Sequence, residues 1–151
     1  MLHAAFATVA LLPGLLTPTV ADVKQQTPLP ILLPNTMQMD VDPLYASGGG
    51  SEQEYSIGIS TVQDCGANAC FIAEFEGHKG GKPWGTRKAT LANGIKARYT
   101  PLSCGGSCSP PILEFKTRGV VYRIQGEFGP AKRNRANLVK MANEAIRQGP
   151  R

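Results

Sequence analysis

The stretch that decides the fold, residues 112–125, reads Ile-Leu-Glu-Phe-Lys-Thr-Arg-Gly-Val-Val-Tyr-Arg-Ile-Gln. In its first half, apolar Leu113 and Phe115 alternate with charged residues, which is the period of a strand with one buried side. Residues 120–125 form a second run, rich in the β-branched and aromatic side chains that favour strands. Because only residues 117–119 separate the two runs, the stretch predicts a tight antiparallel hairpin.

Similar runs upstream predict the rest of a sheet. Residues 55–62 alternate, with Tyr55, Ile57 and Ile59 on one side, and residues 70–75 are richer in apolar side chains. Residues 87–91 and 95–100 are joined by a segment that contains Asn93-Gly94, a strong hairpin-turn signal. About six strands joined by mostly short links predict an antiparallel meander.

The C-terminal residues change to a helical period. Between residues 134 and 148, one stripe collects the apolar side chains Leu138, Met141, Ala142, Ala145 and Ile146. Gly149 followed by Pro150 is a typical helix stop. Because only one side of this helix is apolar, we expect it to cover the apolar face of the sheet. The predicted fold class is therefore α+β, a curved antiparallel sheet of about six strands covered by one C-terminal helix.

The N-terminal third of the chain predicts export. Residues 1–21 carry an apolar run, a Pro13-Gly14 break and small residues before Ala21, as in a secretory signal cleaved near Ala21. The apolar run is shorter than the ~20 residues of a membrane-spanning helix, so no stable membrane span is expected. The predicted organisation is a signal peptide over residues 1–21, an extended Pro- and Gly-containing segment over 22–51 that ends in a flexible connection at 46–51, and a single α+β domain over 52–151. We expect the mature chain to be periplasmic or secreted.

Four cysteines come as two close couples, Cys65 with Cys70 and Cys104 with Cys108. In an exported protein such couples predict disulfides, and their place in turns favours local pairing. Crossed pairing stays open, because on the chain-entropy model a loop of roughly 40 residues gains about 4 kcal/mol against about 2 kcal/mol for a six-residue loop. A zinc site of four thiolates is the functional alternative, with a spacing looser than the C-x2-C typical of structural zinc.

Charge is divided unevenly along the chain. Residues 22–78 hold one basic and eight acidic side chains, whereas residues 79–151 hold fifteen basic and three acidic ones. One interpretation is a basic surface for an anionic polymer or a membrane. The alternative is that acidic strands pair with basic neighbours within one sheet. Nucleic acid is not expected as a partner, because aromatic residues are not interleaved with the basic ones.

The loop that follows residue 77 is the most suggestive ligand site. It contains several glycines together with His78, Lys79, Lys82, Trp84 and Arg87. Exposed backbone amides, cationic side chains and an indole can together hold an anionic or glycan ligand. The alternative is a solvated loop whose Trp84 packs onto the sheet. The Gly-Lys-Ser/Thr ending of a Walker loop is missing, and no cofactor is predicted.

Glu74 and Glu76 are the one close pair of carboxylates with a catalytic interpretation. Residues i and i+2 of a strand point to the same side, roughly 7 Å apart, which is within the range of glycoside hydrolases. Two acids on the solvent side of a strand are equally typical of any soluble sheet. The sequence lacks a G-x-S-x-G nucleophile elbow, so these two carboxylates alone carry the catalytic hypothesis.

Several stretches together resemble a known group of proteins. They are residues 112–115, 119–124 and 138–146, the cysteine-containing stretch Cys-Gly-Ala-Asn-Ala-Cys-Phe at 65–71, and Leu-Ser-Cys-Gly-Gly-Ser-Cys-Ser-Pro-Pro at 102–111. Over residues 28–151 the chain resembles conserved hypothetical exported proteins of cyanobacteria. The C-terminal third is similar, more loosely, to the half-barrel of periplasmic lipoprotein-carrier-like proteins. The resemblance implies a fold and a location and carries no activity.

The sequence thus favours an exported, disulfide-stapled domain of the non-enzymatic binding type. Its expected partner is a protein or a small amphiphilic or anionic ligand, because a single helix over a wide sheet often leaves an apolar groove. Two alternatives belong to other classes. One is a cell-envelope hydrolase that uses Glu74 or Glu76, and the other is an anion-binding surface protein that uses the loop from Lys79 to Lys88.

Overall fold

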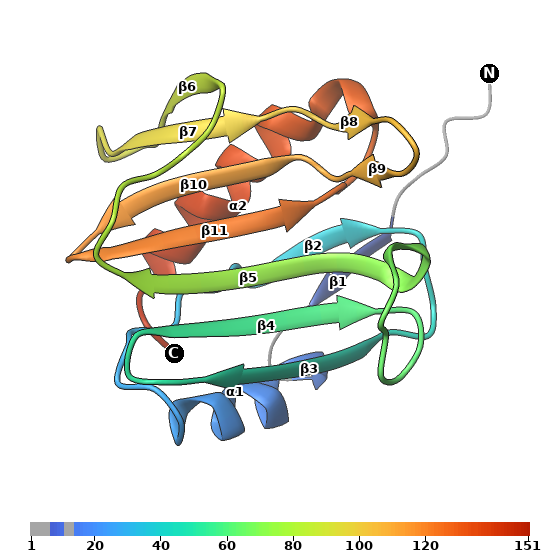
Figure 1. The fold of residues 1–151 in the computed structure, drawn as a ribbon, viewed down its shortest axis with the longest axis horizontal. Coiled ribbons are helices and arrows are strands. Elements are labelled where there is room, and N and C mark those ends of the chain that lie inside the picture. Colours follow the sequence, from blue (N-terminus) through green and yellow to red (C-terminus); the bar gives the residue numbers. More distant parts are fainter. Residues whose placement is uncertain (1–6, 11–13) are drawn as a thin grey trace.

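The chain forms an α+β structure around one seven-stranded antiparallel sheet, which confirms the predicted fold class. The computed structural model describes residues 7–10 and 14–151. Neighbouring strands follow the order β3-β4-β5-β11-β10-β7-β6 (Figure 1). These strands are β3 (Tyr45–Gly50), β4 (Glu54–Ser60), β5 (Phe71–Lys79), β6 (Arg87–Thr90), β7 (Lys96–Thr100), β10 (Ile112–Thr117) and β11 (Val120–Gly126).

Smaller elements surround this sheet. Two short pairs of strands, β1 with β2 and β8 with β9, form separate two-stranded sheets. The short strands are β1 (Ala7–Ala10), β2 (Thr36–Met39), β8 (Ser103–Cys104) and β9 (Cys108–Ser109). The helices are α1 (Thr17–Lys24) and α2 (Asn134–Gln148), with single 3-10 turns at η2 (Asn68–Cys70) and η3 (Ala131–Arg133).

Both predicted hairpin turns are confirmed. Between β10 and β11 the chain reverses through Arg118 and Gly119, whose φ angles are 52° and 79°. Between β6 and β7, Gly94 has a φ of 73° and its N–H donates to the carbonyl of Leu91 at 3.0 Å. Positive φ at these positions matches the twist of the flanking strands, which is why short turns with glycine are favoured there.

The order of the strands departs from the predicted meander at one connection. The chain leaves β5 near the middle of the sheet and enters β6 at its far edge, crossing the intervening strands through residues 80–86 (Figure 1). We call these residues the strap. Lys116 Nζ donates to the Gly81 carbonyl at 2.8 Å, and Glu114 Oε2 accepts from the backbone N–H of Trp84 at 2.6 Å. These long-range bonds hold the strap across β10, and they have no counterpart in local sequence.

Helix α2 covers the apolar face of the sheet, as predicted (Figure 1). Its buried stripe includes Leu138, Met141, Ala142 and Ala145, which pack with sheet residues such as Phe75, Leu113 and Phe115. Gly149 ends the helix with a φ of 79°, and its N–H donates to the carbonyls of Ala145 and Ile146. The amphipathic period therefore predicts both the extent and the orientation of this helix.

The N-terminal segment fills the part of the apolar face that α2 leaves uncovered. Ile31, Leu33 and Met37 are each no more than 1% exposed. Tyr55 Oη accepts from the backbone N–H of Leu32 at 3.2 Å, which fastens the segment to β4. The surface that we expected to form an apolar groove under the helix is therefore occupied by the chain itself.

The expectation of a flexible connection at residues 46–51 is wrong, because most of it belongs to the edge strand β3. Helix α1 packs along this strand, with Val23 fully buried near Gly48. The N–H of Gly50 donates to Gln26 Oε1 at 3.2 Å. Packing against α1 and pairing with β4 thus order a glycine-rich stretch that carries no hydrophobic signal of its own.

The predicted signal peptide falls partly within this structure. Helix α1 spans the expected cleavage point after Ala21, and Leu16 and Val20 lie in the core. Residues 1–6 and 11–13 of the predicted signal lie outside the described residues. Within the part of the chain that is described, no helix has the length and apolar character needed to cross a membrane.

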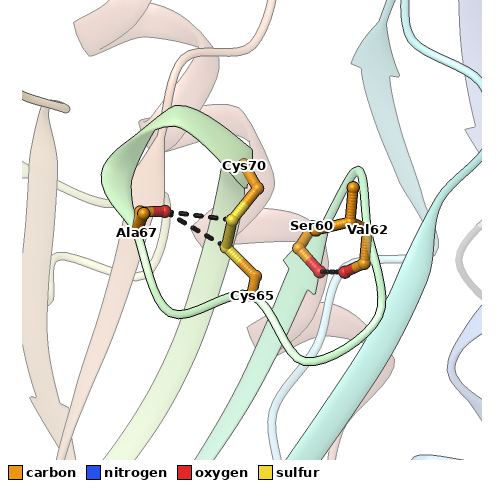
Figure 2. The surroundings of a disulfide bond; sticks show 5 residues. All are labelled: Ser60, Val62, Cys65, Ala67 and Cys70. Carbon is orange, nitrogen blue, oxygen red and sulfur yellow. Dashed lines mark hydrogen bonds between the residues drawn. A yellow bond between two sulfur atoms is a disulfide. The ribbon is translucent and has the colours of Figure 1, made fainter.

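The predicted local pairing of the cysteines is confirmed by two disulfides, Cys65–Cys70 and Cys104–Cys108. Figure 2 shows the first at the turn before β5, with the Ala67 carbonyl oxygen 3.1 Å from each sulfur atom. With every cysteine in a disulfide, the zinc alternative is wrong. Two disulfides are consistent with an oxidising, extracytoplasmic location.

Candidate functional site

The face of the sheet opposite α2 is polar. Successive side chains of a strand alternate between faces, so the residues between the buried ones point to this side. We call it the polar face and define it by Ser56, Gly58, Ser60, Glu74, Glu76, Lys88, Arg98, Glu114, Arg123 and Gln125.

Opposite charges alternate across the polar face. Glu76 lies opposite Arg123, Arg123 lies opposite Glu114, and Glu114 lies opposite Arg98. The carboxylate of Glu76 is 3.4 Å from the Arg123 guanidinium, and both side chains are about one-third exposed. Directly opposed charges of unlike sign stabilise a sheet modestly, by roughly 0.2–1 kcal/mol per pair. The interpretation that acidic strands pair with basic neighbours is confirmed for these residues.

A trough runs along β3 and β4 on this face. Its floor consists of the small residues Ser47, Gly49, Ser56, Gly58 and Ser60. Two hollows of about 440 and 420 Å³ make up the trough, and Gly49 and Ser56 line both. Because the floor side chains are so short, the carboxylates of the next strand stand above them as a wall.

That wall is formed by Glu74 and Glu76 of β5. Glu74 borders the first hollow and Glu76 borders the second. Ser56 Oγ donates to Glu74 Oε1 at 2.6 Å, so the floor orients this carboxylate. The prediction that Glu74 and Glu76 share one side of a strand is therefore confirmed.

The two ends of the trough differ in chemistry. At one end lie Cys65 and Phe71, so the first disulfide fixes the turn that closes the trough there. At the other end Glu54 of β4 lies opposite His78 of β5. The trough therefore has an apolar, covalently held end and a charged end.

Burial raises the pKa of Glu76 above its usual 4.5, and repulsion from the Glu74 carboxylate raises it further. The Arg123 guanidinium acts in the opposite direction without cancelling these effects. Three carboxylates border the trough, from Glu54, Glu74 and Glu76, and Arg123 faces only one of them. The trough therefore carries an excess of negative charge that favours a cation.

The ligand-site residues predicted from the loop do not form one cluster. His78 and Lys79 end β5 beside the trough, whereas Lys82 and Trp84 lie on the strap, with Trp84 66% exposed. Three strands separate β5 from β6, which places the ends of the loop about 19 Å apart at the usual strand spacing.

The side chain of Arg87 points to the apolar face of the sheet, whereas the strap crosses the polar face. The register partner of Arg87 is Tyr99, whose side chain is buried in the core. Residues directly opposite each other in a pair of strands point to the same face. The neighbouring Lys88 therefore points to the polar face, opposite Arg98.

Sequence reasoning missed the trough floor and Arg123. The alternation in residues 55–60 identified the buried side of β4, and the same alternation leaves Ser56, Gly58 and Ser60 on the other side. Three small residues in these positions were the signal for a hollow. Predicting that Arg123 lies beside Glu76 would have required the register of β11 on β5, which the sequence does not specify.

The described residues bring no group of three or more His, Cys, Asp or Glu side chains into an arrangement that holds a metal ion. Comparisons with protein-family models, curated proteins and solved structures find no match to this chain. The resemblance to exported cyanobacterial proteins and to carrier-like half-barrels stays a prediction from the sequence. The trough, its carboxylates and the disulfides are the features on which a function can be built.

Proposed function

We propose that this chain is an exported, disulfide-stapled binding module that holds an extended segment of a partner protein in the trough. The single observation that carries the proposal is a hollow floored by serine and glycine and walled by Glu74 and Glu76. The two disulfides support a place outside the cytoplasm. The export signal over residues 1–21, cleaved near Ala21, supplies the route.

The shape of the trough favours an extended chain. Strand β4 has seven residues, so the trough is about 20 Å long at the usual rise per residue. Short side chains on the floor let a partner backbone approach closely. The hydroxyl of Ser47 can donate and accept hydrogen bonds to the peptide groups of an extended segment. The hydroxyls of Ser56 and Ser60 donate to Glu74 and to the Val62 carbonyl, so they offer the segment acceptors only.

The charge of the trough favours a basic side chain in that segment. Repulsion between the carboxylates of Glu74 and Glu76 is one cause of the raised pKa of Glu76. An ammonium placed between the two carboxylates relieves this repulsion. Partly exposed ion pairs are worth roughly 0–1 kcal/mol each, so the carboxylates contribute specificity more than affinity.

The test uses the oxidised protein and a synthetic peptide, Gly-Ser-Thr-Lys-Thr-Ser-Gly, with a second peptide that carries glutamate in place of lysine. We expect the lysine peptide to bind and the double variant Glu74→Gln, Glu76→Gln to bind it about tenfold more weakly. Raising the salt concentration is expected to weaken binding to the unaltered protein, because the pairs are partly exposed.

A matched control removes two negative charges elsewhere. Asp40 and Glu127 are exposed and lie outside the trough, and the variant Asp40→Asn, Glu127→Gln is expected to bind the lysine peptide normally. Equal loss in both double variants would assign binding to net charge rather than to the trough. Preference for the glutamate peptide would favour the anion-binding loop instead.

The same carboxylates support a second candidate, glycoside hydrolysis. A general acid of this kind needs a carboxyl whose pKa is raised, and burial together with the neighbouring Glu74 carboxylate raises the pKa of Glu76. Release of reducing sugar from cell-wall polysaccharide, lost in both Glu74→Gln and Glu76→Gln, would support it. Absence of turnover together with intact peptide binding would remove it.

A further inference from the structure

Strand β1 lies antiparallel on β2. Val9 lies opposite Met37 and Ala7 lies opposite Met39. The side chain of Val9 is half-buried and packs against the core, whereas the other three side chains of β1 are exposed. β1 is therefore a short strand of small residues that is anchored through a single branched side chain.

The backbone of β2 offers one edge to α2 and the other to β1. The N–H of Thr36 donates to Glu144 Oε1 of α2 at 3.0 Å. Because successive N–H groups of a strand point in opposite directions, the amides of Met37 and Met39 point toward β1. The side chains of both methionines are buried, so their packing in the core fixes the position of β2.

A cavity of about 70 Å³ lies beside the two strands. Met37, Phe128 and Met141 supply its apolar lining, and Lys140 and Glu144 supply charged groups. Thr8 borders it from the side of β1. The cavity and the edge of β2 are therefore parts of one surface.

We infer that β2 and this cavity form a second binding surface, which accepts an extended segment of a partner protein after the export signal is removed. The inference rests on the proposed export, since cleavage near Ala21 removes β1 together with the rest of residues 1–21. The amides of Met37 and Met39 then lose their strand partner, and the cavity loses Thr8 from its wall. An open strand edge beside an apolar lining is suited to β-strand addition.

The segment seated on β2 defines the chemistry of the partner. β1 reads Ala-Thr-Val-Ala and carries no charge. A partner segment therefore has small side chains on either side of one branched apolar residue, which takes the position of Val9 and pairs antiparallel with β2. This chemistry differs from the basic segment expected in the trough.

The test starts from protein recovered after export, whose N-terminus is determined by mass spectrometry. Its methionine methyl groups are labelled with carbon-13, and it is titrated with a synthetic peptide of residues 5–12. We expect an N-terminus at Asp22, saturable binding and chemical-shift changes at Met37 and Met141.

Two altered peptides provide a matched pair. Val9→Asp places a charge at the half-buried position and is expected to weaken binding at least about tenfold. Ala10→Asp places the same charge at an exposed position and is expected to bind like the parent peptide. Equal weakening by both changes would contradict strand addition in the register of β1.

Three other results of this experiment would each contradict the inference in a different way. Protein that keeps residues 1–21 overturns this inference and leaves binding of the lysine peptide to the trough unaffected. Processed protein whose Met37 and Met141 methyls do not respond overturns the second surface alone. A dimer in the absence of peptide, with Met37 at its interface, assigns the edge of β2 to a second copy and also overturns it.

Discussion

Two tyrosine hydroxyls tie the N-terminal segment to the sheet. Tyr55 Oη accepts from the N–H of Leu32, and Tyr122 Oη donates to the carbonyl of Pro30 at 2.8 Å. Burial raises the pKa of Tyr55, and it raises the pKa of Tyr122 to about 12, so both hydroxyls stay protonated over the physiological range. Both bonds join the sheet to the same short segment, residues 30–32, and therefore hold this segment in one position.

Replacing Tyr55 by Phe leaves the N–H of Leu32 buried without an acceptor. We expect Tyr55→Phe to lower the free energy of unfolding by about 1–3 kcal/mol, which is the cost of an unsatisfied buried donor. Denaturant unfolding followed by far-ultraviolet circular dichroism measures the change. Tyr45→Phe, on the half-buried edge strand β3, serves as the control and is expected to change stability by less than about 0.5 kcal/mol.

Glu76 predicts a pH dependence of stability. Its pKa is raised in the folded state, so the folded protein binds this proton more tightly than the unfolded chain. The stabilisation is fully present below pH 4.5 and is lost as the pH rises through the raised value. Glu76→Gln is therefore expected to flatten the fall in stability above pH 4.5, whereas the control Glu127→Gln keeps the slope. An unchanged slope in Glu76→Gln would contradict the assignment.

Strands β4 and β5 illustrate how glycine serves two purposes. A Cβ at Gly77 would overlap the ring of Tyr55, which has no room to move in the core. A Cβ at Gly58 would lie 4.0 Å from the nearest atom, the Ser47 carbonyl oxygen. The first glycine is required for close packing, and the second leaves space in the trough.

These positions predict opposite outcomes for the same substitution. Gly77→Ala is expected to destabilise the fold by about 1–3 kcal/mol through overpacking. Gly58→Ala is expected to leave stability within about 0.5 kcal/mol while reducing binding of the lysine peptide, because its methyl group fills the floor of the trough. Thermal unfolding and peptide titration of both variants test this, and full binding by Gly58→Ala would count against the trough.

The two disulfides staple short loops and leave the sheet itself intact. The chain-entropy model gives about 2 kcal/mol for each loop of five or six residues. We expect Cys65→Ser with Cys70→Ser, and Cys104→Ser with Cys108→Ser, each to lower the free energy of unfolding by about this amount. Only the first pair borders the trough, so only its removal is expected to weaken peptide binding.

Elements with a strong local pattern were predictable from sequence, and elements created by distant contacts were not. The turns at Gly94 and Gly119 and the apolar stripe of α2 follow from residues close together in the chain. Strand β3 has Gly48, Gly49 and Gly50 in place of a hydrophobic pattern, and it is ordered by α1 and β4. The strap likewise depends on Glu114 and Lys116, which lie some thirty residues further along the chain.

Across the chain as a whole, residues from both termini share one core. Leu16 and Leu33 from the N-terminal part pack in the same cluster as Leu138 from α2. At the C-terminus, the N–H of Arg151 donates to the carbonyl of Ile31 at 2.9 Å. The sheet supplies the frame, and the N-terminal segment completes it. Because its prolines are typical of an exposed linker, the local pattern of this segment does not predict that it completes the core.

Burial of Leu16 predicts that the unprocessed chain is the more stable form. Loss of a fully buried leucine costs about 2–5 kcal/mol, and Leu16 is 0% exposed. We expect the full chain to unfold at a higher denaturant concentration than protein cleaved after Ala21, and Leu16→Ala in the full chain to reproduce most of the difference. Equal stability of the two forms would contradict the packing of α1.

The most direct test of the trough as a binding site is chemical-shift mapping of the backbone amides. The oxidised protein is titrated with the lysine peptide, and every shifted amide is placed on the structure. The proposal predicts shifts at Ser56, Gly58, Glu74 and Glu76, with those of the strap unchanged. Shifts confined to the strap around Lys82 and Trp84, with none along β4, would contradict it.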